Sequence, residues 1–128
     1  MRNYSHEIFN DNRPAPYLHI ADEKHYTFTI PNDSGTGSRY KGLILFDLTC
    51  LTLTNLPAVA HDSFMLKQIE DAVLEKILEM YLLTNKQVFI AIDKESTYTP
   101  RTQQIIEEST VLKLASNGHE LFGTAWAR

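Results

Sequence analysis

The sequence lacks the features that mark several large classes of protein. Its single cysteine, Cys50, cannot form an internal disulfide, which favours a reducing compartment. No apolar run approaches the roughly 20 residues that a membrane-spanning helix needs. No basic segment followed by apolar and small residues opens the chain, so we expect no signal peptide. We therefore expect a cytoplasmic location and no membrane contact.

The chain also has little positive charge. It contains 12 Lys and Arg against 16 Asp and Glu, which gives a net charge of -4, and the basic residues do not cluster. By itself the chain is therefore not expected to attract DNA by charge. With 43% hydrophobic and 22% charged residues, the composition is that of a globular domain.

Common catalytic motifs are missing as well. A Walker A phosphate-binding loop needs Gly-x4-Gly-Lys-Ser/Thr, and no segment has that pattern. One cysteine excludes a cysteine-based zinc site, and the five histidines show no metal-binding spacing. No Gly-x-Ser-x-Gly hydrolase motif occurs.

The first half of the chain predicts a lead-in, a hairpin and a helix. Residues 1–16 contain two prolines and predict an irregular segment, which leaves 17–128 as a single domain. Two β-rich segments, 17–20 and 26–30, predict a hairpin. The nearly continuous apolar sequence of residues 39–54 is too long for a strand and predicts a buried helix, with Ser38 as its N-cap.

The second half alternates between strand and helix patterns, which is typical of an α/β sheet with helices on its faces. The elements expected there are, in order, a buried strand at 57–60 that ends at His61, a helix at about 64–83, a buried strand at 87–92, a helix that Thr99 caps with Pro100 at its first position and Ile105 and Ile106 facing inward, and a strand pair formed by 111–114 and 120–126.

One carboxylate stands where a magnesium–nucleotide site needs an acid. Asp62 follows an apolar strand directly, and ligands of α/β sheets bind at the carboxyl ends of the strands. Magnesium prefers one or two carboxylates together with water and phosphate. Asp47 also follows apolar residues, but the apolar pattern continues past it, as in a helix. The alternative role for Asp62 is a cap for the next helix.

A loop rich in glycine and hydroxyl residues precedes the first long helix. Its backbone N–H groups, its hydroxyls and the positive end of the helix dipole could bind an anion, although such a loop can also be a plain connector. The candidate nucleotide-binding residues are Ser34, Gly35, Thr36, Gly37 and Ser38.

Two other readings of the acidic residues remain open. Asp71, Glu75 and Glu79 recur every four residues on one helix face, which is either solvated or a docking face for a basic partner. One alternative function is therefore a non-enzymatic α/β interaction module that would bind its partner through that face. The other is a small metal-dependent hydrolase or nuclease centred on Asp62 and Asp93.

Four segments taken together resemble a known family. They are Gly35-Thr36-Gly37-Ser38-Arg39-Tyr40-Lys41-Gly42, then Phe46-Asp47-Leu48, then Leu56-Pro57 through His61-Asp62-Ser63, then the run from Lys86 to Lys94. In this order, they resemble the uncharacterised domain that ends YydD-like coiled-coil ABC ATPases of bacteria, relatives of SMC and RecN proteins. The similarity extends from about Tyr17 to Trp126.

The resemblance implies the fold and the site residues. The chain would be the C-terminal lobe of an ABC/SMC-type P-loop ATPase head, with a mixed sheet and flanking helices. Residues 34–38 would match the signature loop, which contacts ATP bound to the opposite head, and Asp62 would match the Walker B aspartate that holds Mg²⁺. Residues 69–71 are a loose match for the D-loop. Ser63 replaces the usual glutamate, and Asp93 stands near the position of the switch histidine, so no catalytic residue is assigned.

The resemblance also implies partners. ATP and Mg²⁺ would bind only in the assembled head, which needs an N-terminal Walker A lobe from the same or a neighbouring chain. Two heads would pair into a homodimer, further subunits could join, and DNA would be bound only through the full assembly. The isolated chain would be inactive.

Overall fold

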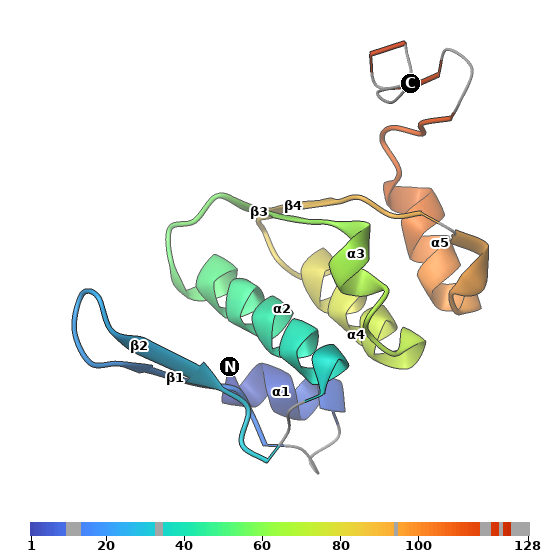
Figure 1. Ribbon diagram of the computed structural model, residues 1–128. Coiled ribbons are helices and arrows are strands. Elements are labelled where there is room, and N and C mark those ends of the chain that lie inside the picture. Colours follow the sequence, from blue (N-terminus) through green and yellow to red (C-terminus); the bar gives the residue numbers. More distant parts are fainter. Residues whose placement is uncertain (10–13, 33–34, 94, 116–118, 121, 124–128) are drawn as a thin grey trace, which may run out of the picture.

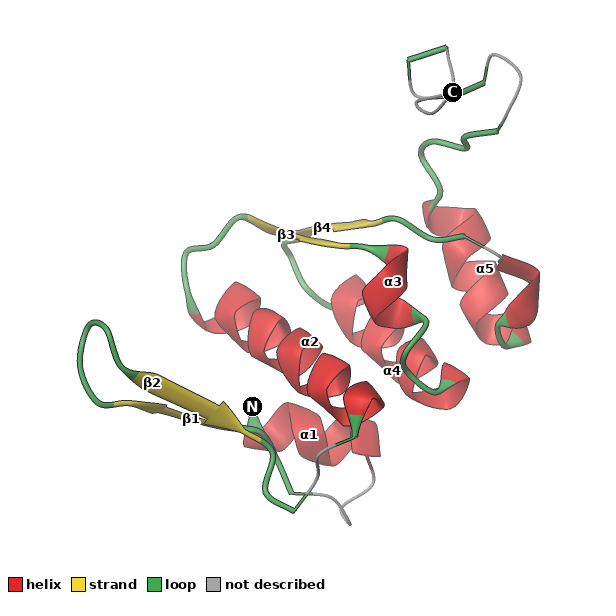
Figure 2. Cartoon of the chain, viewed as in Figure 1, coloured by secondary structure: helices red, strands yellow, loops and turns green. Residues whose placement is uncertain are grey.

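The structure, a computed structural model, describes residues 1–9, 14–32, 35–93, 95–115, 119–120 and 122–123. The fold is mixed α/β, with two small sheets and flanking helices (Figures 1 and 2). In the first sheet β1 pairs with β2, and in the second β3 pairs with β4. None of the helices in the described part is long and apolar enough to span a lipid bilayer.

The expected irregular lead-in is wrong for residues 2–9, because Arg2–Phe9 forms helix α1. Ile8 is buried, and the hydroxyl of Tyr4 donates to Oγ1 of Thr52 at 3.0 Å. Tyr4 and Ile8 are four residues apart and therefore lie on one helix face. The contacts of α1 with two later helices stabilise a segment that is too short to be helical alone.

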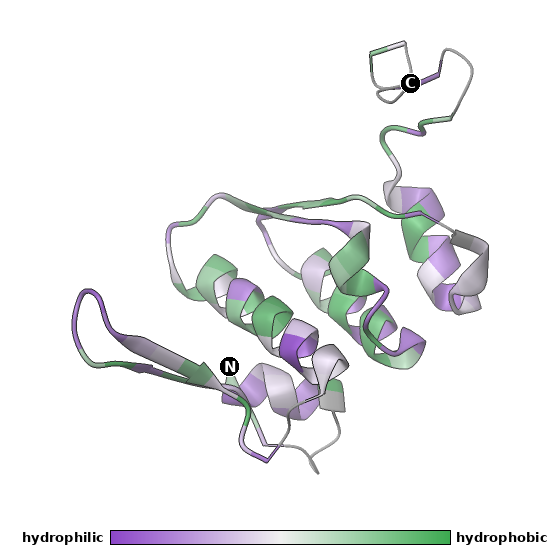
Figure 3. Ribbon diagram, viewed as in Figure 1, coloured by the Kyte–Doolittle hydropathy of each residue, from purple (hydrophilic) through white to green (hydrophobic). Residues whose placement is uncertain are grey.

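The predicted hairpin is confirmed as β1 (Tyr17–Ile20) and β2 (Tyr26–Thr29), which pair antiparallel with Tyr17 opposite Thr29. Oδ1 of Asp22 accepts the backbone N–H groups of Lys24 and His25 at 2.8 and 3.0 Å, which fixes the turn. The turn is hydrophilic and lies away from the helices in Figure 3.

The predicted long helix is confirmed as α2 (Thr36–Leu53), and Asp47 lies within it, as expected. The helix begins earlier than its apolar pattern, and the predicted N-cap is wrong. Gly35 occupies the N-cap position, and Ser38 lies in the first turn. The residues that α2 contributes to the hydrophobic core are Ile44, Leu45, Leu48 and Leu51.

Strands β3 (Ala58–His61) and β4 (Gln87–Ile90) form a parallel pair, with Ala58 opposite Gln87 and His61 opposite Ile90. The expectation of fully buried strands is wrong for one face. Val59 and Val88 pack against the core, whereas Ala60 and Phe89 are exposed on the other face. The second strand also ends at Ile90 rather than at residue 92.

The single helix expected at 64–83 is two helices, α3 (Ser63–Leu66) and α4 (Asp71–Leu82). The connector between them, 67–70, contains no glycine or proline, so the sequence carries no break signal. Leu66 and Ile69 are both buried, so the connector bends to place apolar residues from both sides of the break in the core.

Helix α5 (Pro100–Ser109) follows a short 3₁₀ turn, η1 (Glu95–Thr97), and its predicted cap is confirmed, because Thr99 accepts from the N–H of Thr102. Ile105 and Ile106 are buried, as predicted. The expected final strand pair is wrong in its first half. Residues 111–114 form no strand and are exposed, and part of 120–126 lies outside the described residues.

Candidate functional site

Asp62 lies at the carboxyl end of β3, and its carboxylate is the N-cap of α3. Oδ1 accepts the backbone N–H of Phe64 at 3.1 Å and the hydroxyl of Ser63 at 3.2 Å. The residue is exposed, and Oδ2 has no partner among the described residues. The aspartate therefore fills the capping role and keeps one oxygen free for a ligand.

Asp93 lies at the same edge, three residues after the end of β4, because parallel strands end on the same side. It forms an ion pair with Lys67, the C-cap residue of α3. No group of three or more histidine, cysteine, aspartate or glutamate residues that could hold a metal occurs in the described part of the chain. Because Asp93 is paired with Lys67, Asp62 is the carboxylate at this edge with an oxygen unpartnered among the described residues, and an ion held there would need its other ligands from phosphate and water.

The candidate anion-binding loop packs against the connector between α3 and α4. Gly35 is the N-cap of α2, and Thr36, Gly37 and Ser38 form its first turn, whereas Ser34 lies outside the described residues. A β-carbon added to Gly37 would lie 2.8 Å from the carbonyl oxygen of Gln68. A glycine is therefore required by close packing, whether or not a ligand binds.

Two further contacts fix the start of α2 in place. Nζ of Lys41, a side chain that is only 6% exposed, lies 3.1 Å from Oε1 of Glu70, the N-cap residue of α4. The rings of Tyr40 and Phe64 meet edge to face, with centroids 5.9 Å apart. The start of α2 thus contacts both α3 and the segment 69–71, although the side chain of Asp62 hydrogen-bonds only with Ser63 and Phe64 among the described residues.

A buried polar cluster that the sequence did not reveal lies behind Asp62. His61 is 4% exposed, and its Nε2 lies 2.6 Å from the hydroxyl oxygen of Tyr81 in α4. Its Nδ1 lies 3.9 Å from Oδ2 of Asp47 in α2. The three residues come from three different elements, so no local spacing could have predicted the cluster.

Burial governs the protonation of this cluster. It lowers the pKa of His61, although the nearby Asp47 carboxylate opposes that change, so the imidazole stays neutral over a wider range of pH. Burial also raises the pKa of Asp47, against the opposing effect of His61. The pKa of Tyr81 is raised by burial as well. The phenol hydroxyl is therefore available as a hydrogen-bond donor to the neutral imidazole.

The acidic face of α4 is partly used within the chain. Glu75 accepts the hydroxyl of Thr99, and Oε1 of Glu79 lies 3.3 Å from Nε of Arg101. Both partners belong to the start of α5, so these carboxylates help to hold α5 against α4. Asp71, at the start of α4, is exposed.

Comparison with known proteins gives one family match. A family model described as "Uncharacterised protein conserved in bacteria (DUF2326)" matches residues 4–126. No curated protein and no solved structure matches the chain.

Proposed function

The chain belongs to the bacterial family DUF2326, and we propose that it is the C-terminal half of an SMC-like ABC ATPase head. In this proposal Asp62 is the Walker B aspartate, and residues 34–38 are the signature loop. The observation that carries the proposal is the position of Asp62, which directly follows a parallel strand and has one carboxylate oxygen without a partner among the described residues.

The start of α2 supports the second role. Its first-turn N–H groups and its dipole suit a phosphate group. The contacts of Gly37 and Lys41 hold this turn against Gln68 and Glu70, which lie beside and within the D-loop match, 69–71. Both segments would therefore move as one body if they contacted ATP on an opposite head.

The head would be incomplete without an N-terminal Walker A lobe. Parallel sheets are normally covered by helices on both faces, yet Ala60 and Phe89 are exposed on one face of the β3–β4 pair. The missing lobe, from the same or a neighbouring chain, would supply the Walker A loop. Two heads would then enclose ATP as a homodimer in the cytoplasm, and other subunits or DNA would be engaged only by that assembly.

The chemistry would depend on positioning and charge. Phosphoryl transfer needs alignment and charge neutralisation more than covalent catalysis, and Mg²⁺ bound with ATP would neutralise phosphate charge at this edge. Asp62 would help to hold the Mg²⁺ ion, and the signature loop would orient the terminal phosphate. Ser63 follows Asp62 and cannot act as a carboxylate base, so we propose ATP binding with slow turnover.

The test separates the capping role of Asp62 from its metal-binding role. The chain is co-expressed with a Walker A lobe, and Mg²⁺-dependent binding of a fluorescent ATP analogue is measured. Asp62→Asn keeps a good cap but loses the charge, so binding should weaken while stability is retained. Asp62→Ala should weaken binding equally and should also lower the free energy of unfolding by about 1 kcal/mol.

Asp22→Asn, in the exposed hairpin turn, is the matched control and should leave nucleotide binding unchanged. If the Asp62→Asn complex binds the analogue as tightly as the parent does, the assignment of this site is wrong.

A further inference from the structure

One edge of β4 has no strand partner in the part of the chain that the structure describes. The N–H group of Gln87 donates to the carbonyl oxygen of Pro57, just before β3, at 3.2 Å, and that of Ala91 donates to the carbonyl oxygen of His61 in β3 at 3.0 Å. Because the direction of N–H groups alternates along a strand, those of Val88 and Ile90 point to the opposite edge. That edge therefore offers unpaired main-chain donors and acceptors, which is where another strand adds to a sheet.

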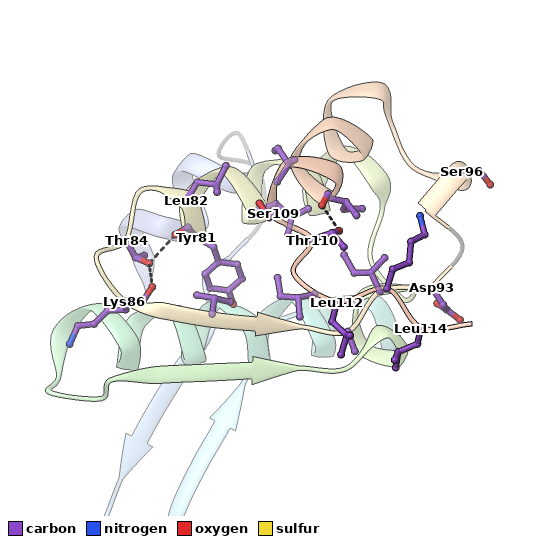
Figure 4. Close-up of a pocket in the computed structure, with 18 residues that line it drawn as sticks. Tyr81, Leu82, Thr84, Lys86, Asp93, Ser96, Ser109, Thr110, Leu112 and Leu114 are labelled. Carbon is purple, nitrogen blue, oxygen red and sulfur yellow. Dashed lines mark hydrogen bonds between the residues drawn. The ribbon is translucent and has the colours of Figure 1, made fainter. Parts of the chain in front are cut away.

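The same edge opens into a groove with a volume of about 1080 Å³ (Figure 4). Helices α4 and α5 and residues 112–114 form its other walls. Leu82, Leu112 and Leu114 line it and are 56%, 61% and 53% exposed. A group of exposed apolar side chains beside an unpaired strand edge is typical of a binding surface.

The segment 111–114 is the second sign that a strand is missing. Its sequence favours a strand, but in the structure it forms none, and Val111 is 98% exposed. Leu112 and Leu114 line the same groove as β4, yet no strand pairing joins the two segments. One inserted strand could pair with β4 and cover these leucines at the same time.

The charge at one end of the groove favours a particular occupant. Lys86 precedes β4, and its Nζ donates to the neutral carbonyl oxygen of Leu56 at 3.0 Å. At the other end of β4 (Figure 4), Asp93 is already paired with Lys67, and Lys113 also lines the groove. An inserted strand would therefore be complementary to the groove if it had an acidic residue at the end that lies beside Lys86.

We propose that this groove is the docking surface for one extended, apolar strand of a partner polypeptide, inserted along the unpaired edge of β4 with its acidic end beside Lys86. The proposal goes beyond the proposed function, which requires a partner lobe but does not say where it binds. It needs neither nucleotide nor metal.

The test uses the full chain and a fluorescent peptide with one glutamate followed by four valine or isoleucine residues, between serine–glycine ends. Fluorescence anisotropy should show saturable binding. A second peptide with lysine in place of the glutamate should bind several-fold more weakly. In hydrogen exchange, the peptide should protect the amides of Val88 and Ile90. The exchange of the Phe89 amide should stay unchanged, because its N–H group already points towards β3.

Leu112→Glu places a carboxylate on the exposed wall and should weaken binding about tenfold or more, because the bound peptide would bury that charge. Leu53→Glu is the matched control. Leu53 is 75% exposed at the end of α2 and does not line the groove, so its change should leave binding as it was.

The proposal is overturned if the parent chain does not bind the first peptide, if both peptides bind equally, if Leu112→Glu has no effect, or if Val88 and Ile90 gain no protection. These outcomes are independent of the Asp62 test. Peptide binding together with unchanged nucleotide binding in Asp62→Asn would refute the ATPase assignment alone.

Discussion

Gly37 lies against the carbonyl oxygen of Gln68, so that a β-carbon at position 37 would be 2.8 Å from that oxygen. The contact joins the first turn of α2 to the connector between α3 and α4. The glycine that sequence reasoning assigned to a nucleotide loop therefore also has a purely structural reason to be there.

Gly37→Ala should destabilise the chain. Alanine favours a helix, but the opposing atom belongs to the backbone and cannot rotate away, so we expect a net loss of about 1–2 kcal/mol. Urea unfolding measures the change. Gly42→Ala is the control, because its β-carbon would meet the flexible end of Ile30, and its stability should stay the same or rise. Equal losses in the two variants would contradict the contact with Gln68.

Tyr81→Phe should lower the free energy of unfolding, because it breaks the buried cluster. Removing the hydroxyl leaves Nε2 of His61 without its 2.6 Å partner in a buried position, which should cost about 1–3 kcal/mol. The control, Tyr4→Phe, removes a hydrogen bond to Thr52 that is only partly buried and should cost less. Thermal unfolding of both variants compares the two losses of stability. A larger loss of stability for Tyr4→Phe would contradict the prediction that the buried hydrogen bond of Tyr81 is the more stabilising one.

The lowered pKa of His61 gives stability a pH dependence of known sign. Below about pH 6.5 the unfolded chain binds a proton that the folded chain, with its buried imidazole, does not bind. The free energy of unfolding should therefore fall as the pH falls through this window. The raised pKa of Asp47 acts in the opposite sense, because there the folded chain binds the proton more tightly as the pH falls towards the ordinary carboxyl range.

Denaturation curves of the chain without metal or nucleotide, between about pH 7.5 and about pH 5.5, would measure this dependence. His61→Gln should flatten it, and His19→Gln, at an exposed position of β1, should leave it in place. An unchanged slope in His61→Gln would show that another group causes the dependence.

The elements that the sequence predicted well carry their own local signals. The hairpin has β-rich segments around a turn, and α5 begins at Thr99 followed by Pro100, a cap and a residue that suits the first helical position. Helix α2 is a long run without a break. In each case the information lies within a few neighbouring residues.

The elements that it missed depend on contacts between distant segments. Helix α1 forms because α2 and α4 offer surfaces to Tyr4 and Ile8, and the connector 67–70 bends without a glycine or proline because its apolar neighbours reach one core. His61 meets Tyr81 and Asp47 only through the fold. Residues 111–114 have strand propensity but no described partner strand, and propensity alone does not form a sheet. The position of Asp62 was predictable because a strand and a helix start flank it, whereas its ligand is still a proposal.

Thr99→Ala should weaken the attachment of α5 to α4. The Thr99 hydroxyl accepts the N–H of Thr102 at 3.1 Å and donates to Glu75, so one side chain both caps α5 and ties it to the acidic face of α4. Its loss should lower the free energy of unfolding by about 1–2 kcal/mol. Thr99→Ser keeps the hydroxyl and should retain most of the stability. Arg101→Ala, which removes the exposed ion pair with Glu79, should lower the free energy of unfolding by only about 0–1 kcal/mol. If serine at position 99 were as damaging as alanine, the methyl group rather than the hydroxyl would be the stabilising feature.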